Sequence, residues 1–148
     1  MIPVPISSIL RHKGNGVWSI APDASVYQAI AIMAEKGIGA LPVIADGQLL
    51  GILSERDYAR KVVLQSRSSK DTLVSEIMTT PVVSVGPSNT VEDCMRTMTL
   101  QRIRHLPVVD EGKILGIVSI GDLVRKVIST QGEIIQHLQE YISGRPSA

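Results

Sequence analysis

The sequence predicts a mixed α/β fold of the α+β type, built from two copies of one β-α-β-β-α unit. Three observations predict it: an internal repeat, pairs of apolar strand segments that flank a turn, and helix-start signals at matching positions in the two copies. A shift of 65 positions lays residues 19–62 over residues 84–127 without a gap. Two copies are too few for an open solenoid, so we expect one compact body with a pseudo-twofold axis.

Each unit begins with a short strand and a helix. The segments Trp18–Ile20 and Val83–Val85 have strand character and end close to a proline. Ser25 and Thr90 follow them, each with a Gln or Asp three positions later, which is the spacing of a helix capping box. In the first unit Gly37 predicts the end of the helix.

The second part of each unit predicts a β-hairpin and a further helix. Two apolar runs flank Asp46-Gly47, and two similar runs flank Glu111-Gly112. Because the runs are almost continuously apolar, we expect the strands to be covered on both faces. Ser54 and Ser119 then mark the start of a second helix in each unit.

The segments outside the repeats are shorter. Residues 64–72 are polar and predict a loop, and "VSEIMTTP" predicts a short helical turn that Pro81 stops. An apolar stripe near the C-terminus predicts a short helix that ends at Gly144; its residues are Ile134, Ile135, Leu138 and Ile142. A short isolated helix is marginal in water, so we expect this one to dock on the body or on a second copy. Short helices are thus expected at both ends of the body.

Composition excludes several functional classes. The formal net charge is +1, and the 148 residues include no Phe, one Trp and three Tyr, which argues against nucleic-acid binding. One cysteine, Cys94, and three scattered histidines give no metal-ligand spacing. Cys94 lies on the inward stripe of its predicted helix, which indicates a buried, inert thiol. No signal peptide or membrane span is predicted, and we expect a soluble, cytoplasmic protein.

The most specific motif is Gly-Ile-x-Ser-x-x-Asp, which occurs twice. Gly51, Ser54 and Asp57 carry it in the first unit, and Ser119 and Asp122 carry it in the second after Gly116. One interpretation is structural, with each serine capping a helix and each aspartate favouring its first turn. The other is binding, because a helix start attracts anions and a carboxylate can accept bonds from two ribose hydroxyls. The two interpretations are compatible.

These features together resemble a CBS-domain pair, or Bateman module. The resemblance rests on "ALPVIADGQLLGILSERD", "HLPVVDEGKILGIVSIGD" and the segment "VSEIMTTPVVSV" between the units. It covers about residues 17–128 and is strongest with stand-alone CBS-pair proteins of bacteria and plant mitochondria. It implies CBS motif 1 at 17–63, a linker with a short helix at 64–80, CBS motif 2 at 81–128, and a C-terminal helix and tail at 129–148.

The resemblance implies that clefts in the module bind an adenosine compound, foremost AMP, with NAD, ADP, ATP or S-adenosylmethionine as other members of the class. No catalytic residue and no metal are implied. The expected ribose and phosphate contacts are Ser54, Arg56, Asp57, Ser119, Gly121, Asp122, Arg104 and His105. The expected base contacts, mainly through the backbone, are Ile20, Pro22, Ile38, Gly39, Ala40, Val85, Pro87 and Ile103.

The two units differ at the positions that would touch phosphate. Arg104-His105 corresponds to the uncharged Gly39-Ala40, and Arg56 corresponds to Gly121. We therefore expect two unequal clefts. The alternatives stay open: Arg56 and Arg104 as solvated surface charges, and His105 as a histidine at the edge of the core. Arg11 and Lys13 are expected to be surface residues.

The function that the resemblance implies is a non-catalytic nucleotide sensor that forms a homodimer and reports to an unidentified protein partner. The first alternative is an adaptor that binds a thioredoxin-type or metabolic enzyme independently of nucleotide. An enzyme ranks third, because the sequence offers no nucleophile–base pair, metal set or supported carboxylate pair.

Overall fold

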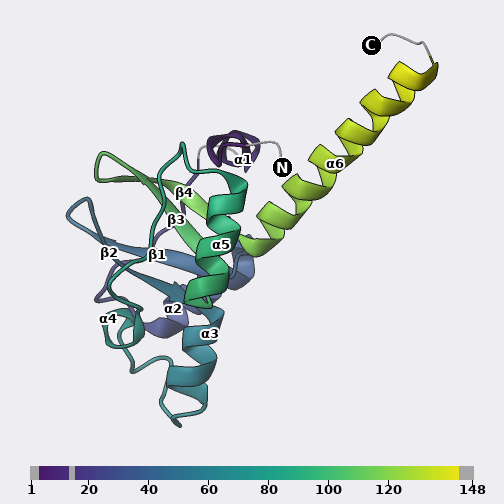
Figure 1. Ribbon diagram of the computed structural model, residues 1–148. Coiled ribbons are helices and arrows are strands. Elements are labelled where there is room, and N and C mark those ends of the chain that lie inside the picture. Colours follow the sequence, from purple (N-terminus) through teal and green to yellow (C-terminus); the bar gives the residue numbers. More distant parts are fainter. Residues whose placement is uncertain (1–3, 14–15, 144–148) are drawn as a thin grey trace.

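A computed structural model describes residues 4–13 and 16–143, which form two similar halves followed by one long helix (Figure 1). Each half contains a two-stranded antiparallel sheet with helices around it. This arrangement confirms the predicted fold class. The elements in chain order are α1 (Ser7–Lys13), α2 (Val26–Lys36), β1 (Ala40–Ala45), β2 (Gln48–Ser54), α3 (Glu55–Tyr58), the π-helical turn η1 (Ala59–Val63), α4 (Val74–Ile77), α5 (Val91–Gln101), β3 (His105–Asp110), β4 (Lys113–Ser119) and α6 (Ile120–Ser143).

The two hairpins have equivalent turns and equivalent strand registers. In both turns the two central residues have positive φ: 52° at Asp46 and 74° at Gly47, and 50° at Glu111 and 77° at Gly112. Two positive φ values define the type I′ turn, whose twist matches that of the flanking strands. Both predicted hairpins are confirmed. The expected cover on both faces holds for β1 and β3, whereas the first residues of β2 and β4 are more exposed.

The strands predicted at Trp18–Ile20 and Val83–Val85 are reduced to one bridge residue each. Ile20 and Val85 make single parallel bridges to the neighbouring hairpin strands. In a parallel ladder the next N–H along the chain would come from Pro22 or Pro87, and proline has no N–H to donate. The pairing therefore stops after one residue in both halves.

Helix boundaries follow the capping signals closely. Ser25 and Thr90 form complete capping boxes at the starts of α2 and α5, and Gly37 ends α2 with a φ of 64°. The predicted short turn, α4, ends at Ile77, because Met78 already has the extended ψ of 150°. It therefore ends before Pro81, the residue that was expected to stop it.

Each half has its own apolar core, and each core is completed by the helix that precedes the other half in the sequence. Ile6, just before α1, and Ile9 of α1 are buried in the second core, with Val91 and Leu106. Val74 and Ile77 of α4 are buried in the first core, with α2 and the first hairpin. Thus α1 precedes the first half in the sequence but packs on the second half. Helix α4 precedes the second half in the sequence but packs on the first half.

Backbone hydrogen bonds show that the two contacts are equivalent. The N–H of Ile6 donates to the carbonyl oxygen of Asn89, and the N–H of Val74 donates to that of Ala24. Asn89 and Ala24 are related by the repeat shift of 65, whereas Ile6 and Val74 are 68 positions apart. The internal repeat therefore includes α1 and α4, but with a three-residue difference in spacing.

The C-terminal segment forms the end of α6, which runs unbroken from Ile120 to Ser143 and projects from the body (Figure 1). The expectation of a separate short helix from residue 129 is thus wrong, because no proline or turn signal interrupts the chain there. Docking of this stripe on the body is also contradicted. Its residues Ile134, Ile135, Leu138 and Ile142 are exposed. The predicted end at Gly144 lies outside the described residues.

Candidate ligand clefts between the two halves

Two cavities are lined by residues from both halves, and they differ in size. The larger has a volume of about 440 Å³ and contains Asp122, and we call it the Asp122 cleft. The smaller has a volume of about 230 Å³ and contains Asp57, and we call it the Asp57 cleft. Each combines the Ser-x-x-Asp motif of one half with residues just before the first hairpin strand of the other half. The expectation of two unequal clefts agrees with this geometry.

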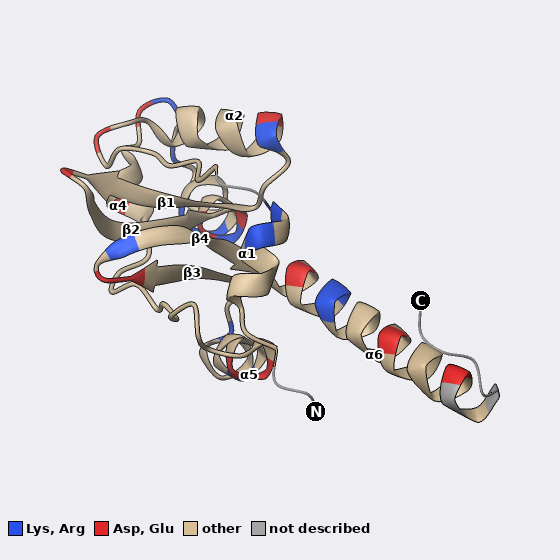
Figure 2. Ribbon diagram, turned by 90° about the horizontal axis from the view of Figure 1, so that it is seen from above, with Lys and Arg blue, Asp and Glu red and all other residues tan. Residues whose placement is uncertain are grey.

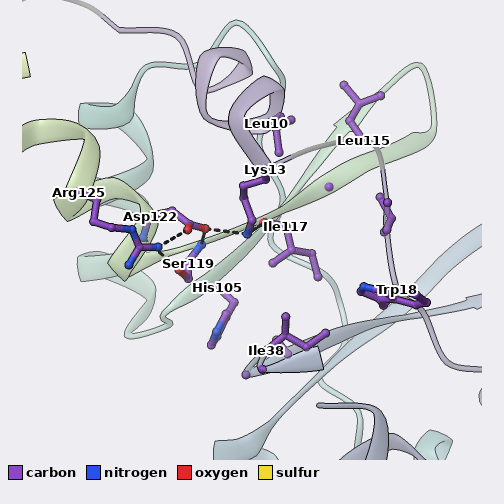
Figure 3. A pocket seen from close by; sticks show the side chains of 16 residues that line it. Leu10, Lys13, Trp18, Ile38, His105, Leu115, Ile117, Ser119, Asp122 and Arg125 are labelled. Carbon is purple, nitrogen blue, oxygen red and sulfur yellow. Dashed lines mark hydrogen bonds and ion pairs between the residues drawn. The ribbon is translucent and has the colours of Figure 1, made fainter. Parts of the chain in front are cut away.

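In the Asp122 cleft, α1 supplies a cation that sequence reasoning missed (Figure 3). Lys13 Nζ lies 2.8 Å from Asp122 Oδ2 and donates to the carbonyl oxygen of Ile117 at 2.8 Å. Arg125 donates to Asp122 Oδ1 at 2.7 Å, and the N–H of Ser119 donates to Oδ2 at 2.8 Å. The expectation that Lys13 is an ordinary surface residue is wrong, because its ammonium group reaches into the cleft.

The protonation of Asp122 reflects these contacts. Burial alone would raise the pKa of its carboxyl group, but the hydrogen bond from Lys13 and the N–H of Ser119 outweigh that effect. The pKa of Asp122 therefore lies below its ordinary value. The residue is ionised at neutral pH, and its negative charge is compensated by the two neighbouring cations, Lys13 and Arg125.

Asp57 accepts hydrogen bonds at both of its carboxylate oxygens. Its Oδ2 accepts from the N–H of Ser54 at 2.9 Å and the hydroxyl of the same residue at 3.1 Å. Its Oδ1 accepts from the hydroxyl of Thr79 at 3.0 Å and lies 3.0 Å from Lys61 Nζ. A carboxylate has about four acceptor positions, so those of Asp57 are filled by these four donors.

The motif serines are helix caps in both halves. Ser54 Oγ accepts from the N–H of Asp57 at 3.2 Å, and Ser119 Oγ accepts from that of Asp122 at 3.1 Å. The structural interpretation of the motif is therefore confirmed. The Ser54 hydroxyl also donates to Asp57 at 3.1 Å, and a side-chain hydrogen bond from Ser119 likewise lowers the pKa of Asp122. In both halves the motif hydroxyl therefore interacts with the motif aspartate.

The two arginines of the Asp57 cleft have different roles. Arg56 donates to the carbonyl oxygen of Arg102 at 2.8 Å, and so ties the first half to the end of α5. Arg104 lines the same cleft and is exposed, and its guanidinium group makes no hydrogen bond or ion pair with any residue that the structure describes. Of these two arginines, Arg104 is the one available to an anionic ligand.

His105 and Gly39 separate the two clefts, since both residues line both cavities. A Cβ atom on Gly39 would lie 3.0 Å from His105 Nε2, so the glycine leaves the space that the imidazole ring uses. Burial lowers the pKa of His105, and the nearby carboxylate of Glu55 opposes this only in part. His105 is therefore neutral at pH 7. It lies at the edge of the core and faces ligand space.

The structure brings together only some of the residues expected to contact the base. Ile38, Gly39 and Ala40 line the Asp122 cleft, and Ile103 lines the Asp57 cleft. Five of the expected site residues line neither cavity: Ile20, Pro22, Val85, Pro87 and Gly121.

Packing and hydrogen bonding explain these positions. Ile20 belongs to the first core, and Val85 packs against the second. The carbonyl oxygens of Pro22 and Pro87 accept from the N–H groups of Ser75 and Ser7. Gly121 lies under Arg125, whose guanidinium group would be 3.4 Å from a Cβ atom added to the glycine. The cavity residues that sequence reasoning missed include Lys13, Val17, Trp18, Thr79 and Val83.

Other chemistry is poorly supported within the described residues. No group of three or more His, Cys, Asp or Glu side chains is placed to hold a metal ion there. Burial raises the pKa of the Cys94 thiol to about 11, as expected for an inert core cysteine. None of the described helices is long and apolar enough to cross a membrane.

Comparison with known proteins gives consistent matches over nearly the whole chain. The family model described as "CBS domain" matches twice, at residues 8–64 and 74–129. The chain is 42% identical to "CBS domain-containing protein CBSX3, mitochondrial" of Arabidopsis thaliana, covering 94% of this chain and 72% of that protein. It is 35% identical to "CBS domain-containing protein YhcV" of Bacillus subtilis, covering 85% and 89%. A solved structure of a protein with CBS domains from Burkholderia ambifaria is 51% identical, with a TM-score of 0.83 over 86% of this chain and 96% of that one.

Proposed function

The chain belongs to the CBS-domain family, and on that premise we propose that it is a non-catalytic sensor that binds an adenine nucleotide between its halves. Stand-alone proteins of this family are generally regulatory modules or adaptors. One observation carries the proposal: each cleft takes its Ser-x-x-Asp motif from one half and its opposite wall from the other. A ligand in either cleft would contact both halves and could favour one relative arrangement of them.

The Asp122 cleft is the primary site in this proposal. Its volume of about 440 Å³ falls within the range of roughly 300–1,000 Å³ that is usual for ligand pockets, and the Asp57 cleft is smaller. Asp122 and Ser119 offer a carboxylate and a hydroxyl that can bind ribose hydroxyls in exchange for one of their present contacts. Lys13 and Arg125 supply positive charge for a phosphate. AMP is the first candidate, and ADP, ATP and NAD offer the same adenosine group with longer phosphate chains.

The sensor acts by conveying ligand state to a protein partner, with the chain present as a homodimer. For this to be signalling, the ligand must bind two conformations with unequal affinity. We propose that the protein is located in the cytoplasm. The Arabidopsis relative differs, since its name places that protein in mitochondria.

Calorimetry and thermal unfolding with AMP, ADP, ATP, NAD and S-adenosylmethionine test the proposal. A ligand at a hundredfold excess over its dissociation constant should stabilise the folded state by about 2.7 kcal/mol. GMP and inorganic phosphate serve as controls for the base and for the charge. The absence of binding and of stabilisation with every adenosine compound would overturn the proposal.

A second candidate is an adaptor that binds a redox or metabolic enzyme without nucleotide. The observation that favours it is the saturation of Asp57, whose four acceptor positions are all filled by the protein itself. A double variant, Asp57→Ala with Asp122→Ala, separates the two functions. Partner binding that is unchanged in this variant and unaffected by nucleotide supports the adaptor, whereas loss of nucleotide-dependent partner binding supports the sensor.

A further inference from the structure

One face of α6 carries a regular seam of exposed residues, spaced alternately four and three positions apart. We define the α6 seam as Val124, Ile128, Gln131, Ile135, Leu138 and Ile142. The five apolar members are 42%, 63%, 56%, 56% and 83% exposed in chain order, and Gln131 is also exposed. Spacing of 4-3-4-3-4 places successive residues on one side of a helix that pairs with another helix. The seam has the pattern of a coiled coil, with Ile128, Ile135 and Ile142 at the a positions.

The outer part of α6 is exposed along its length in the part of the chain that the structure describes. Residues 131–139 are all exposed, and the helix projects from the body (Figure 1). The segment also contains Gly132, which weakens a helix interior by about 1 kcal/mol relative to alanine. A stretch of this length is marginal in water unless its apolar face packs against something. The outer part of α6 therefore needs a partner surface.

The charges along α6 indicate which partner fits. The spacing places Glu133 and Glu140 on the side of α6 opposite the seam. No Lys or Arg follows Lys126 as far as residue 143, and the described residues in the outer part of α6 are coloured red or tan, without blue, in Figure 2. A helix that binds an anionic membrane surface would be expected to have basic residues on its polar face. The seam itself is uncharged, so two copies can meet along it without placing like charges together. A second copy of this chain satisfies the pattern, because a twofold axis makes a seam complementary to itself.

The flanking positions indicate the direction of pairing. Val127 and Ile134 lie on one side of the seam, at the g positions, whereas Arg125, Gly132 and Gln139 lie on the other side, at the e positions. Parallel helices would place each g residue beside an e residue, apolar against polar. Antiparallel helices place g beside g and e beside e, so Ile134 would meet the same residue of the second copy.

We propose that two copies of this chain associate through an antiparallel pair of α6 helices. In this register Ile128 of one copy packs against Leu138 of the other, Ile135 against Gln131, and Ile142 against Val124. The end of each helix then lies at the base of the other. An apolar groove of about 210 Å³ is present at that base, and it is lined by Val4, Val91, Lys126, Val127, Thr130, Gln131 and Ile134. The association goes beyond the proposed nucleotide binding and does not depend on it.

Cysteine cross-linking of the full chain tests both contact and direction. Ile128→Cys and Leu138→Cys chains, mixed in equal amounts and oxidised, should form disulfides mainly between the two different variants. The wild type is the control, because its only cysteine, Cys94, is buried and should not cross-link. Disulfides within each variant alone, or no cross-link in the mixture, would overturn the proposal.

A second test uses a charge on the seam. Ile135→Glu should halve the mass measured by light scattering, because the two introduced carboxylates would be buried without partners. His137→Glu is the matched control, since residue 137 is exposed and outside the seam. The mass of the control should equal that of the wild type. An Ile135→Glu chain with unchanged mass and unchanged thermal unfolding would contradict the proposed interface.

Discussion

Lys13 Nζ lies 2.8 Å from Asp122 Oδ2, although the two residues are 109 positions apart in the chain. The equivalent aspartate, Asp57 in α3, is compensated by Lys61, which is only four positions away in the adjoining turn η1. Both aspartates thus have a local cation, Arg125 for Asp122 and Lys61 for Asp57, but the contact from a distant residue is made by Lys13 to Asp122. Because the distant cation comes from α1, the larger cleft depends on how that helix is docked.

Replacing Lys13 by methionine should raise the pKa of Asp122, since the variant keeps the apolar stem but loses the cation. The depressed pKa of Asp122 stabilises the folded state above the ordinary pKa of about 3.9, and this contribution is lost as pH falls through the folded-state value. The variant should lose about 0.5–1 kcal/mol of stability at pH 7, because Lys13 is partly exposed. Carboxyl NMR titration and denaturant unfolding measure the two effects, with Lys113→Met as the surface control. An unchanged pKa of Asp122 would show that the contact is absent in solution.

Asp122→Ala and Asp57→Ala should have different effects on binding and stability. Asp122→Ala should weaken nucleotide binding in the larger cleft by about 1–3 kcal/mol, because ribose hydroxyls lose a charged acceptor. Asp57→Ala should mainly destabilise the fold, by about 1–3 kcal/mol, because it leaves four donors without their acceptor. Calorimetry and denaturant unfolding of both variants provide the comparison. Equal loss of affinity in both clefts from either single variant would contradict the assignment of two sites.

Lowering the pH should destabilise the fold through His105. Its pKa is lowered in the folded state, so below about pH 6.5 the unfolded chain takes up the proton more readily. The resulting stability is therefore full above pH 6.5 and declines as pH falls toward the folded-state pKa. His105→Gln, which cannot gain this proton, should show a smaller decline between pH 7.5 and 5.5 in urea unfolding curves. His137→Gln is a suitable control, because residue 137 is exposed. Parallel pH profiles for wild type and His105→Gln would refute the role assigned to this residue.

A methyl group on Gly39 should disturb the wall between the clefts. Its Cβ atom would lie 3.0 Å from His105 Nε2 and 3.2 Å from Cε1, so the imidazole ring must move. We expect Gly39→Ala to lower stability by about 1–2 kcal/mol through this overpacking. Gly16→Ala is the matched control, because nothing lies within 4 Å of the Cβ position there. Thermal unfolding and the His105 NMR signal should both change in Gly39→Ala and stay the same in Gly16→Ala.

The thiol of Cys94 should not react in the native protein. Its side chain is fully buried and its pKa is raised to about 11, so almost no thiolate is present at pH 8. Ellman's reagent should therefore modify it only in denaturant, or at the rate of global unfolding. Fast modification under native conditions would mean that α5 opens locally.

Much of the fold was predictable because its local signals are strong and agree with one another. The turns at Asp46-Gly47 and Glu111-Gly112, the caps at Ser25 and Thr90, and the stop at Gly37 each depend on a few neighbouring residues. The repeat then supported each assignment with a second copy. These turns and helix caps form as the local sequence predicts, because the tertiary packing of the two halves is compatible with them.

The position of Lys13 could not be predicted in the same way. The contact of Lys13 with Asp122 depends on α1 packing against the second half. The repeat shift of 65 positions does not align α1 with α4, because equivalent residues of these two helices are 68 positions apart. A comparison at a shift of 68 would have aligned Ile6, Ile9 and Leu10 with Val74, Ile77 and Met78. That alignment is the sequence signal for the helix that carries Lys13 into the cleft.

The side-chain positions around the clefts were also only partly predictable. Ile20 and Val85 were expected to contact the ligand, yet each makes its single bridge inside a core. Val17, Trp18 and Val83 come slightly earlier in the same segments and line the cavities instead. Because these segments are too short to pair as strands, their sequence pattern does not determine which residues face inward.

The exchange of α1 and α4 between the halves means that the sequence repeat is not an autonomous folding unit. A polypeptide cut within residues 64–72 would leave each fragment with the helix that the other fragment's core requires. Neither fragment could close its core alone, but a mixture of the two could restore both by complementation. For the intact chain, the same interlock predicts one cooperative melting transition, in which both cores are lost together.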